Sequence, residues 1–475
     1  MYDPSAPDPV RRRLLQAPAF AAVAALGGCA DDSVIVEDVA QLEPHRVARV
    51  VRPRSPDAVA RALRDWPGPV SIGGGRYSQG GQIAAEGSLH LDMRGLNRLV
   101  RLDPVARVVR AQAGMTWRDL LDHLDPHDLS VAVMPSYSNF TLGGSVSVNC
   151  HGRYVGSGPI VNSVRALGLA TASGEHIDLD RRSHPDLFAA VIGGYGGMGV
   201  VTEVELDLAR NERLQRHVER VALEDYVETF HARVAGDPDA VLHNADLVPP
   251  DFAQPLAITW RRTQAALTVT GRLVPRDLDY RKQQGLIWTA FELPGGDRLL
   301  AYDQSAMLAA TQPVVWRNHE ASLDADSLEP PTRALSTYLL QEYFIPVAGF
   351  LAFARAFAAI VRRHDVNVLN VSIRHSPADT TTLLRWAPRE VFSFVVYYKQ
   401  RSNHYASSMA ERWTRELIDA ALDLGGRYYL PYRLHASRAQ FARAYPEAVR
   451  YAQLKRRWDP QFRFRNALLD AYLPT

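Results

Sequence analysis

The stretch Ser71-Ile72-Gly73-Gly74-Gly75-Arg76-Tyr77-Ser78-Gln79-Gly80-Gly81 follows a short apolar run and holds five glycines in nine residues. Glycine adopts positive φ at little cost and lets backbone N–H groups approach an anion with no Cβ in the way. A loop of this kind is typical of a phosphate-binding turn or of a mobile turn. The run alone does not separate the two.

The loop fits neither of the two common nucleotide motifs. A P-loop ends in Gly-Lys-Ser/Thr, whereas Gly80 is followed by Gly81 and Gln82. A Rossmann fingerprint needs a crossover helix directly after the loop and an acid about 20 residues further on, for which Asp92 is a candidate. Only residues 82–88 separate the loop from the strand-like run 89–91, so no helix fits there.

Two further glycine stretches follow the first. Residues 141–152 read Thr-Leu-Gly-Gly-Ser-Val-Ser-Val-Asn-Cys-His-Gly, and residues 192–201 read Ile-Gly-Gly-Tyr-Gly-Gly-Met-Gly-Val-Val. The stretch at 192–201 precedes a strand expected over 201–208. Three glycine loops within roughly 130 residues favour one long ligand held by backbone groups on several sides.

These segments, in this order and with Pro-Asp-Leu-Phe at 185–188, resemble the vanillyl-alcohol-oxidase-type (PCMH-type) FAD-binding domain. Within that family they are most similar to bacterial oxidases related to the aldonolactone and alditol oxidases, which residues 458–466 also resemble. The resemblance covers 47–208 and returns at the C-terminus. It implies an α+β fold: a two-part FAD-binding domain of the vanillyl-alcohol-oxidase type with an inserted α+β substrate (cap) domain.

Length and composition agree with an ordinary globular enzyme. A chain of 475 residues suffices for two or three domains, and it is 47% apolar and 22% charged. The formal charge of +2 gives no reason to expect nucleic acid or an anionic surface as a main partner. The cysteines are Cys29 and Cys150, so we expect no internal disulfide in the folded body.

The N-terminus is typical of a bacterial targeting segment. Arg11-Arg12-Arg13 resembles a twin-arginine signal, and the apolar run 17–26 is too short to span a bilayer. Leu26-Gly27-Gly28-Cys29 resembles a lipoprotein cleavage box, with a plain signal peptide as the alternative. We therefore expect a signal peptide over 1–28 and a location in the bacterial periplasm or cell envelope. Membrane contact is expected only through a lipid anchor at Cys29.

The remaining chain divides into four expected parts. A tether covers 29–45, the FAD-binding domain 46–210, the substrate or cap domain 211–430, and a C-terminal segment returning to the FAD domain 431–475. Ser55, Thr116 and Ser183 are expected to cap helices that end near 66, 124 and 190. From residue 214 strand-like runs alternate with amphipathic helices, which favours a separate α+β domain.

By family position the resemblance assigns a set of residues to the flavin. They are Gly74, Gly75, Arg76, Tyr77, Ser78, Gly80, Pro135, Gly143, Gly144, Ser147, Asn149, His151, Gly152 and Val200. The alternative for His151 is a hydrogen-bonded core histidine. We favour a flavin contact because Gly152 follows it and the backbone there must be tight.

The link to the flavin is expected to be non-covalent. Covalent members of the family attach the flavin through a histidine at the position that Tyr77 holds here. Cys150 is the other nucleophile nearby, and we interpret it as a small buried residue.

The substrate site is expected in the second domain. Ser372-Ile373-Arg374 resembles a Glu-Ile-Arg segment of the alditol oxidases, so Arg374 is kept and the acid is lost. The family's histidine on the next strand aligns near Val395, and its late lysine near Tyr432. Arg374 is a candidate for orienting an oxygen-rich substrate or for stabilising anionic reduced flavin.

Several other residues are candidates for this site. Lys399, Tyr432 and His435 join Arg374 as catalytic candidates. The alternatives are a solvated strand end for Lys399 and a surface cap for His435. His375 and Tyr343 are weaker candidates, and Tyr343 also fits a core aromatic.

No metal site is predicted, because Pro126 breaks the helix on which His123 and His127 would have to stand.

The sequence therefore predicts an FAD-dependent oxidoreductase that oxidises an alcohol, lactol or lactone carbon of a small polar, sugar-like molecule. Oxygen or another acceptor would reoxidise the flavin. The alternatives are an oxidase of lipid-linked sugars, whose known members also lack the covalent histidine, and an envelope flavoprotein without turnover.

Overall fold

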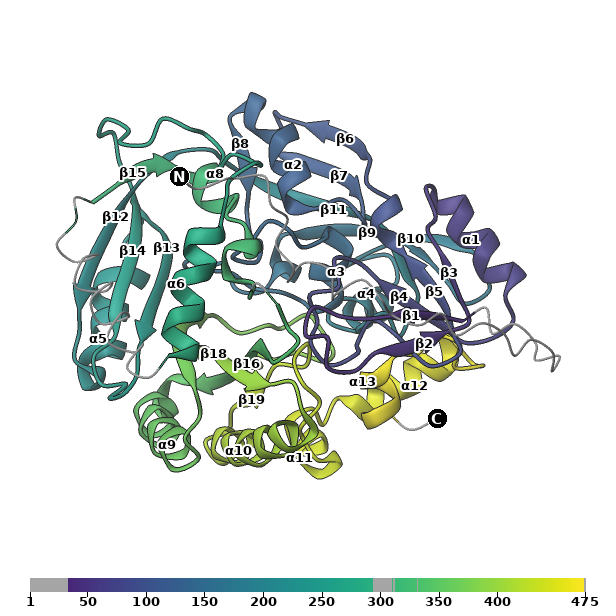
Figure 1. Ribbon diagram of the computed structural model, residues 1–475. Helices are drawn as coiled ribbons and strands as arrows, with labels where there is room; N and C mark the ends of the chain where they lie inside the picture. The colour runs from purple at the N-terminus through teal and green to yellow at the C-terminus, as the bar shows by residue number, and fades with distance from the viewer. Residues whose placement is uncertain (1–32, 294–309, 311, 331, 474–475) are drawn as a thin grey trace, which may run out of the picture. The chain divides into compact units, whose positions relative to one another are not determined.

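The computed structural model describes residues 33–293, 310, 312–330 and 332–473 (Figure 1). The expected signal peptide and Cys29 lie outside the described residues. No helix among the described residues is both long enough and apolar enough to cross a bilayer.

The first glycine loop connects two strands of a small parallel sheet. Its strands are ordered β3-β5-β4, with β3 over Arg49–Val51, β4 over Val70–Gly73 and β5 over Leu89–Asp92. Helix α1 (Pro56–Asp65) joins β3 to β4, and Ser55 caps it as expected by accepting from the N–H of Ala58. The connection from β4 to β5 contains no α-helix, so the glycine loop itself makes the parallel crossover.

A second, six-stranded sheet carries the other two glycine segments. Its order is β10-β9-β11-β7-β6, with β8 paired to β11. The strands are β6 (Leu99–Asp103), β7 (Val108–Gln112), β8 (Leu129–Val131), β9 (Val164–Ala170), β10 (His176–Asp180) and β11 (Val200–Arg210). The helices between them are α2 (Trp117–Leu124), α3 (Leu142–Ser147) and α4 (Pro185–Val191).

One of the two helix caps predicted in this region is confirmed and the other is wrong. Thr116 caps α2 as expected. Ser183 does not cap α4, and that prediction was wrong. Helix α4 begins at Pro185 after His184, which has φ 57°, and the N–H of Ser183 instead donates to Oδ1 of Asp180 at 2.7 Å. The aspartate closes a local turn that removes Ser183 from the helix start.

The region after residue 211 contains an eight-stranded antiparallel sheet in the order β15-β12-β14-β13-β17-β18-β16-β19. The strands are β12 (Arg213–Arg220), β13 (Ala240–Leu247), β14 (Leu256–Arg262), β15 (Val314–Trp316), β16 (Ser336–Pro346), β17 (Val368–Ser376), β18 (Val391–Arg401) and β19 (Arg427–Tyr428). The helices are α5 (Tyr226–Phe230), α6 (Arg281–Glu292), α8 (Arg317–Ala321), α9 (Phe350–Arg363) and α10 (His404–Asp423).

Helices α9 and α10 cover one face of this sheet near β16 and β18 (Figure 1). Tyr343 points to that face, where it is fully buried with its ring 5.5 Å from the ring of Phe353. The alternative interpretation of Tyr343 as a core aromatic is therefore confirmed. Because side chains alternate along a strand, its neighbour Glu342 points to the other face.

The C-terminal segment packs against the first sheet and the third glycine loop. Its helices are α11 (Arg438–Ala444), α12 (Ala448–Trp458) and α13 (Ala467–Tyr472). Phe464 forms a bridge with Val70 at the edge of β4. The ammonium of Lys455 donates to the carbonyl oxygens of Gly197 at 2.8 Å and Phe464 at 2.9 Å. The segment thus holds the third loop in place.

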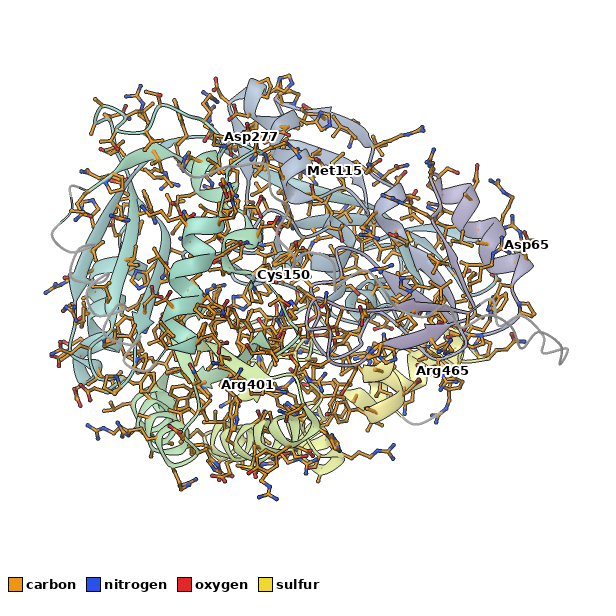
Figure 2. The ribbon with its side chains drawn as sticks, in the orientation of Figure 1. Asp65, Met115, Cys150, Asp277, Arg401 and Arg465 are labelled. Atoms are coloured by element: carbon orange, nitrogen blue, oxygen red, sulfur yellow. The ribbon has the colours of Figure 1, made fainter. Side chains whose placement is uncertain are left out.

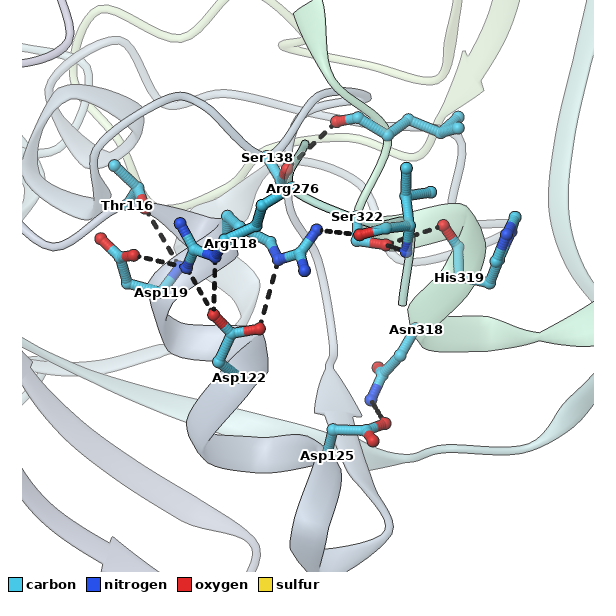
Figure 3. A network of polar contacts seen from close by, with 12 residues as sticks. Thr116, Arg118, Asp119, Asp122, Asp125, Ser138, Arg276, Asn318, His319 and Ser322 are labelled. Atoms are coloured by element: carbon cyan, nitrogen blue, oxygen red, sulfur yellow. Dashed lines mark hydrogen bonds and ion pairs between the residues drawn. The ribbon is translucent and has the colours of Figure 1, made fainter. Parts of the chain in front are cut away.

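A polar network joins α2 to the chain segment around α8 (Figure 3). Arg276 pairs with Asp119 at 2.7 Å and also with Asp122. The amide of Asn318 donates to Asp125 at 2.8 Å. These contacts fix the second part of the chain against the first beside the strand that leads to the second glycine segment.

Candidate active site

A cavity lies where the three glycine segments meet the face of the eight-stranded sheet that is opposite to α9 and α10. Its unfilled space, open mouth included, is about 1510 Å³. The lining includes residues 74–78 of the first loop, Thr141, Gly143, Gly144 and Ser147 of the second, Gly196, Met198 and Gly199 of the third, and Leu340, Glu342, Arg374 and Val395 of the sheet. The cavity is therefore lined by all three glycine segments and by the sheet.

The first loop presents unused hydrogen-bond donors to this cavity. The backbone N–H groups of Arg76, Tyr77 and Ser78 have no acceptor among the described residues. Three successive free amides in a loop form an anion-binding concavity. The loop therefore fits a diphosphate, which is the anionic part of FAD.

Arg76 adds a positive charge to the same loop. Its guanidinium lies 4.0 Å from the carboxylate of Asp92, and its Nη2 is 3.3 Å from Nε2 of His90, while its Nε has no hydrogen-bond partner. Burial, together with the charge of Arg76, lowers the pKa of His90 to about 4. His90 is thus neutral at pH 7 and leaves the charge of Arg76 available to an anion.

The second segment brings Cys150 into the lining of the cavity. Figure 2 shows Cys150 in the interior of the protein, where its side chain is buried. Burial raises the pKa of its thiol far above the usual range, so the thiolate that would attack a flavin is suppressed. Tyr77 packs its ring against Phe140 with the centroids 4.5 Å apart, and burial raises the pKa of its phenol.

His151 and Glu342 form a buried pair on the wall of the cavity. Nε2 of His151 lies 2.6 Å from Oε1 of Glu342, and the two side chains are 6% and 2% exposed. The imidazole ring lies 4.8 Å from the ring of Trp386. The hydroxyl of Tyr432 is 3.4 Å from the other oxygen of Glu342, and burial followed by the charge of Glu342 raises the pKa of Tyr432.

The cavity face of the sheet carries one row of directly opposed residues. Asp246 of β13 is opposite Ser372 of β17, Ser372 is opposite Val395 of β18, and Val395 is opposite Glu342 of β16. Opposed residues in antiparallel strands share a face. Arg374 stands two residues beyond Ser372 and shares this face.

Arg374 is a cation without a carboxylate partner. No acidic side chain among the described residues forms an ion pair with it, and its buried Nε has no hydrogen-bond partner. Its charge lowers the pKa of Tyr137, a cavity residue whose pKa burial raises overall. A guanidinium of this kind can bind oxygen atoms of a ligand.

Most of the residues that the sequence assigned to the flavin line this cavity. They are Gly74, Gly75, Arg76, Tyr77, Ser78, Pro135, Gly143, Gly144, Ser147 and His151. The lining does not include Gly80, Asn149, Gly152 or Val200. Asn149 supports the segment from behind by donating to Asp379 at 2.9 Å, and a Cβ added at Gly152 would lie 2.1 Å from the carbonyl oxygen of Met134.

Of the residues predicted to act on the substrate, some line the cavity and others do not. Arg374 and Tyr432 line the cavity, whereas Lys399 and His435 do not. Lys399 is paired with Glu292 at 2.6 Å. His435 is buried elsewhere, and that burial, with the nearby Arg433, lowers its pKa to about 3.

Sequence reasoning missed Glu342, Tyr137 and Tyr429, all of which line the cavity. A signal for Glu342 existed in the two-residue period of its strand, which separates it from the buried Tyr343. Tyr137 and Tyr429 follow loops whose paths only the folded chain defines.

Comparison with known proteins agrees with this geometry. Residues 47–180 match the family described as FAD binding domain. The chain is 32% identical over 173 residues to decaprenylphosphoryl-β-D-ribose oxidase of Mycolicibacterium smegmatis, covering 35% of this chain and 37% of that protein. It is 29% identical over 177 residues to L-galactono-1,4-lactone dehydrogenase 2 of Oryza sativa subsp. japonica, covering 37% and 30%.

It is also 31% identical over 175 residues to cytokinin dehydrogenase 2 of Oryza sativa subsp. japonica, covering 34% of this chain and 31% of that protein. The chain thus spans about a third of the length of these curated relatives. The family match over 47–180 contains the first and second glycine segments, including the free amides of the first loop. The chain therefore carries an FAD-binding domain over residues 47–180.

Proposed function

We propose that the chain is an FAD-dependent oxidoreductase. It oxidises a CH–OH carbon of a small polar molecule such as an alcohol, a lactol or a lactone. One observation carries the proposal. A single cavity joins the free amides of the first glycine loop to a sheet face that bears Glu342 and Arg374. A cofactor held by the loop and a substrate held by the sheet would thus share one enclosed space.

The residues of the FAD domain have separate tasks in this proposal. The amides of Arg76, Tyr77 and Ser78, with the Arg76 guanidinium, would hold the diphosphate of FAD. When bound, FAD supplies the hydride acceptor, and the protein supplies binding, orientation and electrostatics.

The residues of the sheet would hold the substrate. Arg374 would bind a substrate oxygen through donors that have no protein partner. The apolar side chains of Leu340 and Val395 cover the wall beside it and limit the access of water.

We also propose that FAD is bound without a covalent link. A tyrosine, Tyr77, holds the position of the family's histidine, and the Cys150 thiol is disfavoured as a nucleophile by its raised pKa. Burial raises the pKa of both groups, which disfavours the phenolate or thiolate that would form such a link.

A second candidate function is the oxidation of lipid-linked sugars. Its support is the similarity to decaprenylphosphoryl-β-D-ribose oxidase over the FAD-binding region. A third is a flavin relay without substrate turnover, supported by Ser372, Val395 and Tyr432 at positions where the resembled oxidases carry an acid, a histidine and a lysine.

The cellular setting is a further part of the proposal. Arg11-Arg12-Arg13 and Cys29 support export to the periplasm or envelope, with a lipid anchor at Cys29. Loss of the protein from the membrane fraction on C29S would agree with the anchor. The electron acceptor is proposed to be oxygen or another oxidant, and hydrogen peroxide release under air would identify oxygen.

The test uses the FAD-loaded full chain without air. L-Galactono-1,4-lactone, D-arabinono-1,4-lactone and a lipid-linked pentose are each mixed with it, and the flavin absorbance is followed. Bleaching by a lactone agrees with the first function, and bleaching by the lipid-linked sugar alone agrees with the second. Bleaching by dithionite but by none of the three would contradict both and favour the relay.

A further inference from the structure

We propose that His151 and Glu342 together form the proton acceptor for the substrate hydroxyl. This inference rests on the oxidation proposed above and names the base that it requires. His151 comes from the second glycine segment and Glu342 from β16, so the pair joins the flavin side of the cavity to the substrate side.

The pair has the geometry of a base and the residue that positions it. Nε2 of His151 and Oε1 of Glu342 are 2.6 Å apart, so the two buried groups are in close polar contact. The Trp386 ring beside His151 restricts the orientation of the imidazole. The second carboxylate oxygen of Glu342 accepts a long hydrogen bond from the Tyr432 hydroxyl, at 3.4 Å, and from no other side chain among the described residues. That oxygen is the one available to a substrate hydroxyl.

The rest of the sheet face explains why this pair is needed. The row Asp246–Ser372–Val395–Glu342 crosses the cavity face, and its two central residues cannot take a proton at neutral pH. Glu342 lies two strands from Ser372, or about 10 Å across the sheet. A carboxylate is therefore present on the same face, but displaced from position 372 toward the flavin loops.

The proposed step balances in atoms and charge. The substrate O–H bond breaks and its proton passes to the carboxylate of Glu342. The C–H bond breaks with its electron pair, and the hydride passes to oxidised FAD. The O–H electron pair forms the C=O bond of the product. His151, whose Nε2 lies 2.6 Å from Oε1 of Glu342, holds the carboxylate in place, and Arg374 binds the substrate oxygen as negative charge develops on it.

The test compares E342Q with a matched control. His375 and Glu390 form the same kind of pair at 2.7 Å, but neither residue lines the cavity, so E390Q removes a similar contact elsewhere. Both variants are loaded with FAD, and dithionite must bleach both. With L-galactono-1,4-lactone, or whichever probe bleaches the wild type, E342Q is expected to bleach about 100- to 10,000-fold more slowly. E390Q is expected to bleach at the wild-type rate.

Two further measurements separate a base from a structural contact. In E342A, added formate is expected to restore bleaching in proportion to its concentration, whereas added chloride is not. In the protein without substrate, the proton between His151 and Glu342 is expected to give a downfield magnetic resonance signal that is absent from both E342Q and H151Q. If E342Q does not fold, E342D replaces it, with a smaller loss of rate expected.

The outcomes are distinguishable. In one outcome, dithionite bleaches the wild-type flavin while none of the substrate probes does. In that case the proposed oxidation is contradicted, and the inference that rests on it is contradicted as well. If the wild type bleaches and E342Q bleaches as fast, the function stands and the inference is overturned. Slow bleaching in E342Q together with formate rescue in E342A supports the inference. Slow bleaching in E342Q that has lost the resonance signal, without formate rescue in E342A, overturns it.

Discussion

Gly74 and Thr141 are in direct contact: a Cβ added to Gly74 would lie 2.3 Å from Oγ1 of Thr141. The same hydroxyl accepts hydrogen bonds from the N–H groups of Gly75 and Gly144, at 3.3 Å each. Thr141 therefore both caps α3 and anchors the first loop. The first and second glycine segments are thus one structural unit around the cavity.

G74A is therefore expected to weaken FAD binding. The added methyl group must displace the Thr141 hydroxyl, which breaks two hydrogen bonds and moves the amides of the first loop. We expect FAD to dissociate at least about tenfold more readily, equivalent to 1.4 kcal/mol. Titration of the chain with FAD measures this. The control is G285A in α6, where a Cβ meets no atom within 4 Å. Equal affinity in G74A and G285A would contradict the assignment of the loop.

Replacement of Arg374 is expected to reduce kcat/KM. Its Nε has no hydrogen-bond partner and its guanidinium forms no ion pair within the part of the chain that the structure describes, so R374A removes donors available to the ligand without breaking an ion pair there. A hydrogen bond to a charged group is worth about 1.5–3 kcal/mol, so we expect a loss of roughly 10- to 150-fold. R374K should recover only part of it, because an ammonium lacks the planar fork. A wild-type kcat/KM in R374A would remove Arg374 from the site.

The helix caps show which features of the fold can be predicted from local sequence. Ser55 and Thr116 cap α1 and α2 as predicted because each hydroxyl needs only backbone amides within its own helix. The cap predicted at Ser183 is wrong because the N–H of Ser183 already donates a hydrogen bond to Asp180, three residues earlier. A competing local acceptor is enough to cancel a cap signal.

The residues of the candidate site also differ in whether local sequence could predict them. Most residues assigned from the first two glycine segments line the cavity, because close backbone approach to a ligand requires glycine at fixed places in the sequence. Glu342 was missed, and Lys399 and His435 were included, because their surroundings are tertiary. Lys399 meets Glu292 and His435 meets Arg433, and neither contact follows from spacing in the chain.

Stability is expected to depend on pH through His435. Burial lowers its pKa to about 3 in the folded protein, against about 6.5 when unfolded. Between these values the unfolded state binds the extra proton, so stability rises with pH from 3 to 6.5 and is lost as the pH falls. H435Q should reduce the slope of unfolding free energy against pH by up to about 1.4 kcal/mol per pH unit. Chemical unfolding at several pH values checks this, and an unchanged slope would contradict it.

Lys455 is expected to be important for stability. Its ammonium is 2.8 Å from the carboxylate of Asp459, and the side chains are 5% and 0% exposed. K455M leaves Asp459 buried without its cation, which costs about 3–5 kcal/mol. The control is R443M, which breaks an exposed ion pair with Asp423 and should cost less than about 1 kcal/mol. Thermal unfolding compares the two, and equal melting temperatures would contradict the structural role of Lys455.

The most direct measurement is the visible spectrum of the purified chain, before and after precipitation with acid. Three glycine segments around one cavity, free amides in the first loop and a disfavoured Cys150 thiol together predict a yellow protein whose FAD passes into the supernatant. FAD that stays with the pellet would contradict the non-covalent assignment and make Tyr77 and Cys150 the first residues to replace. A colourless protein that takes up no added FAD would contradict the account as a whole.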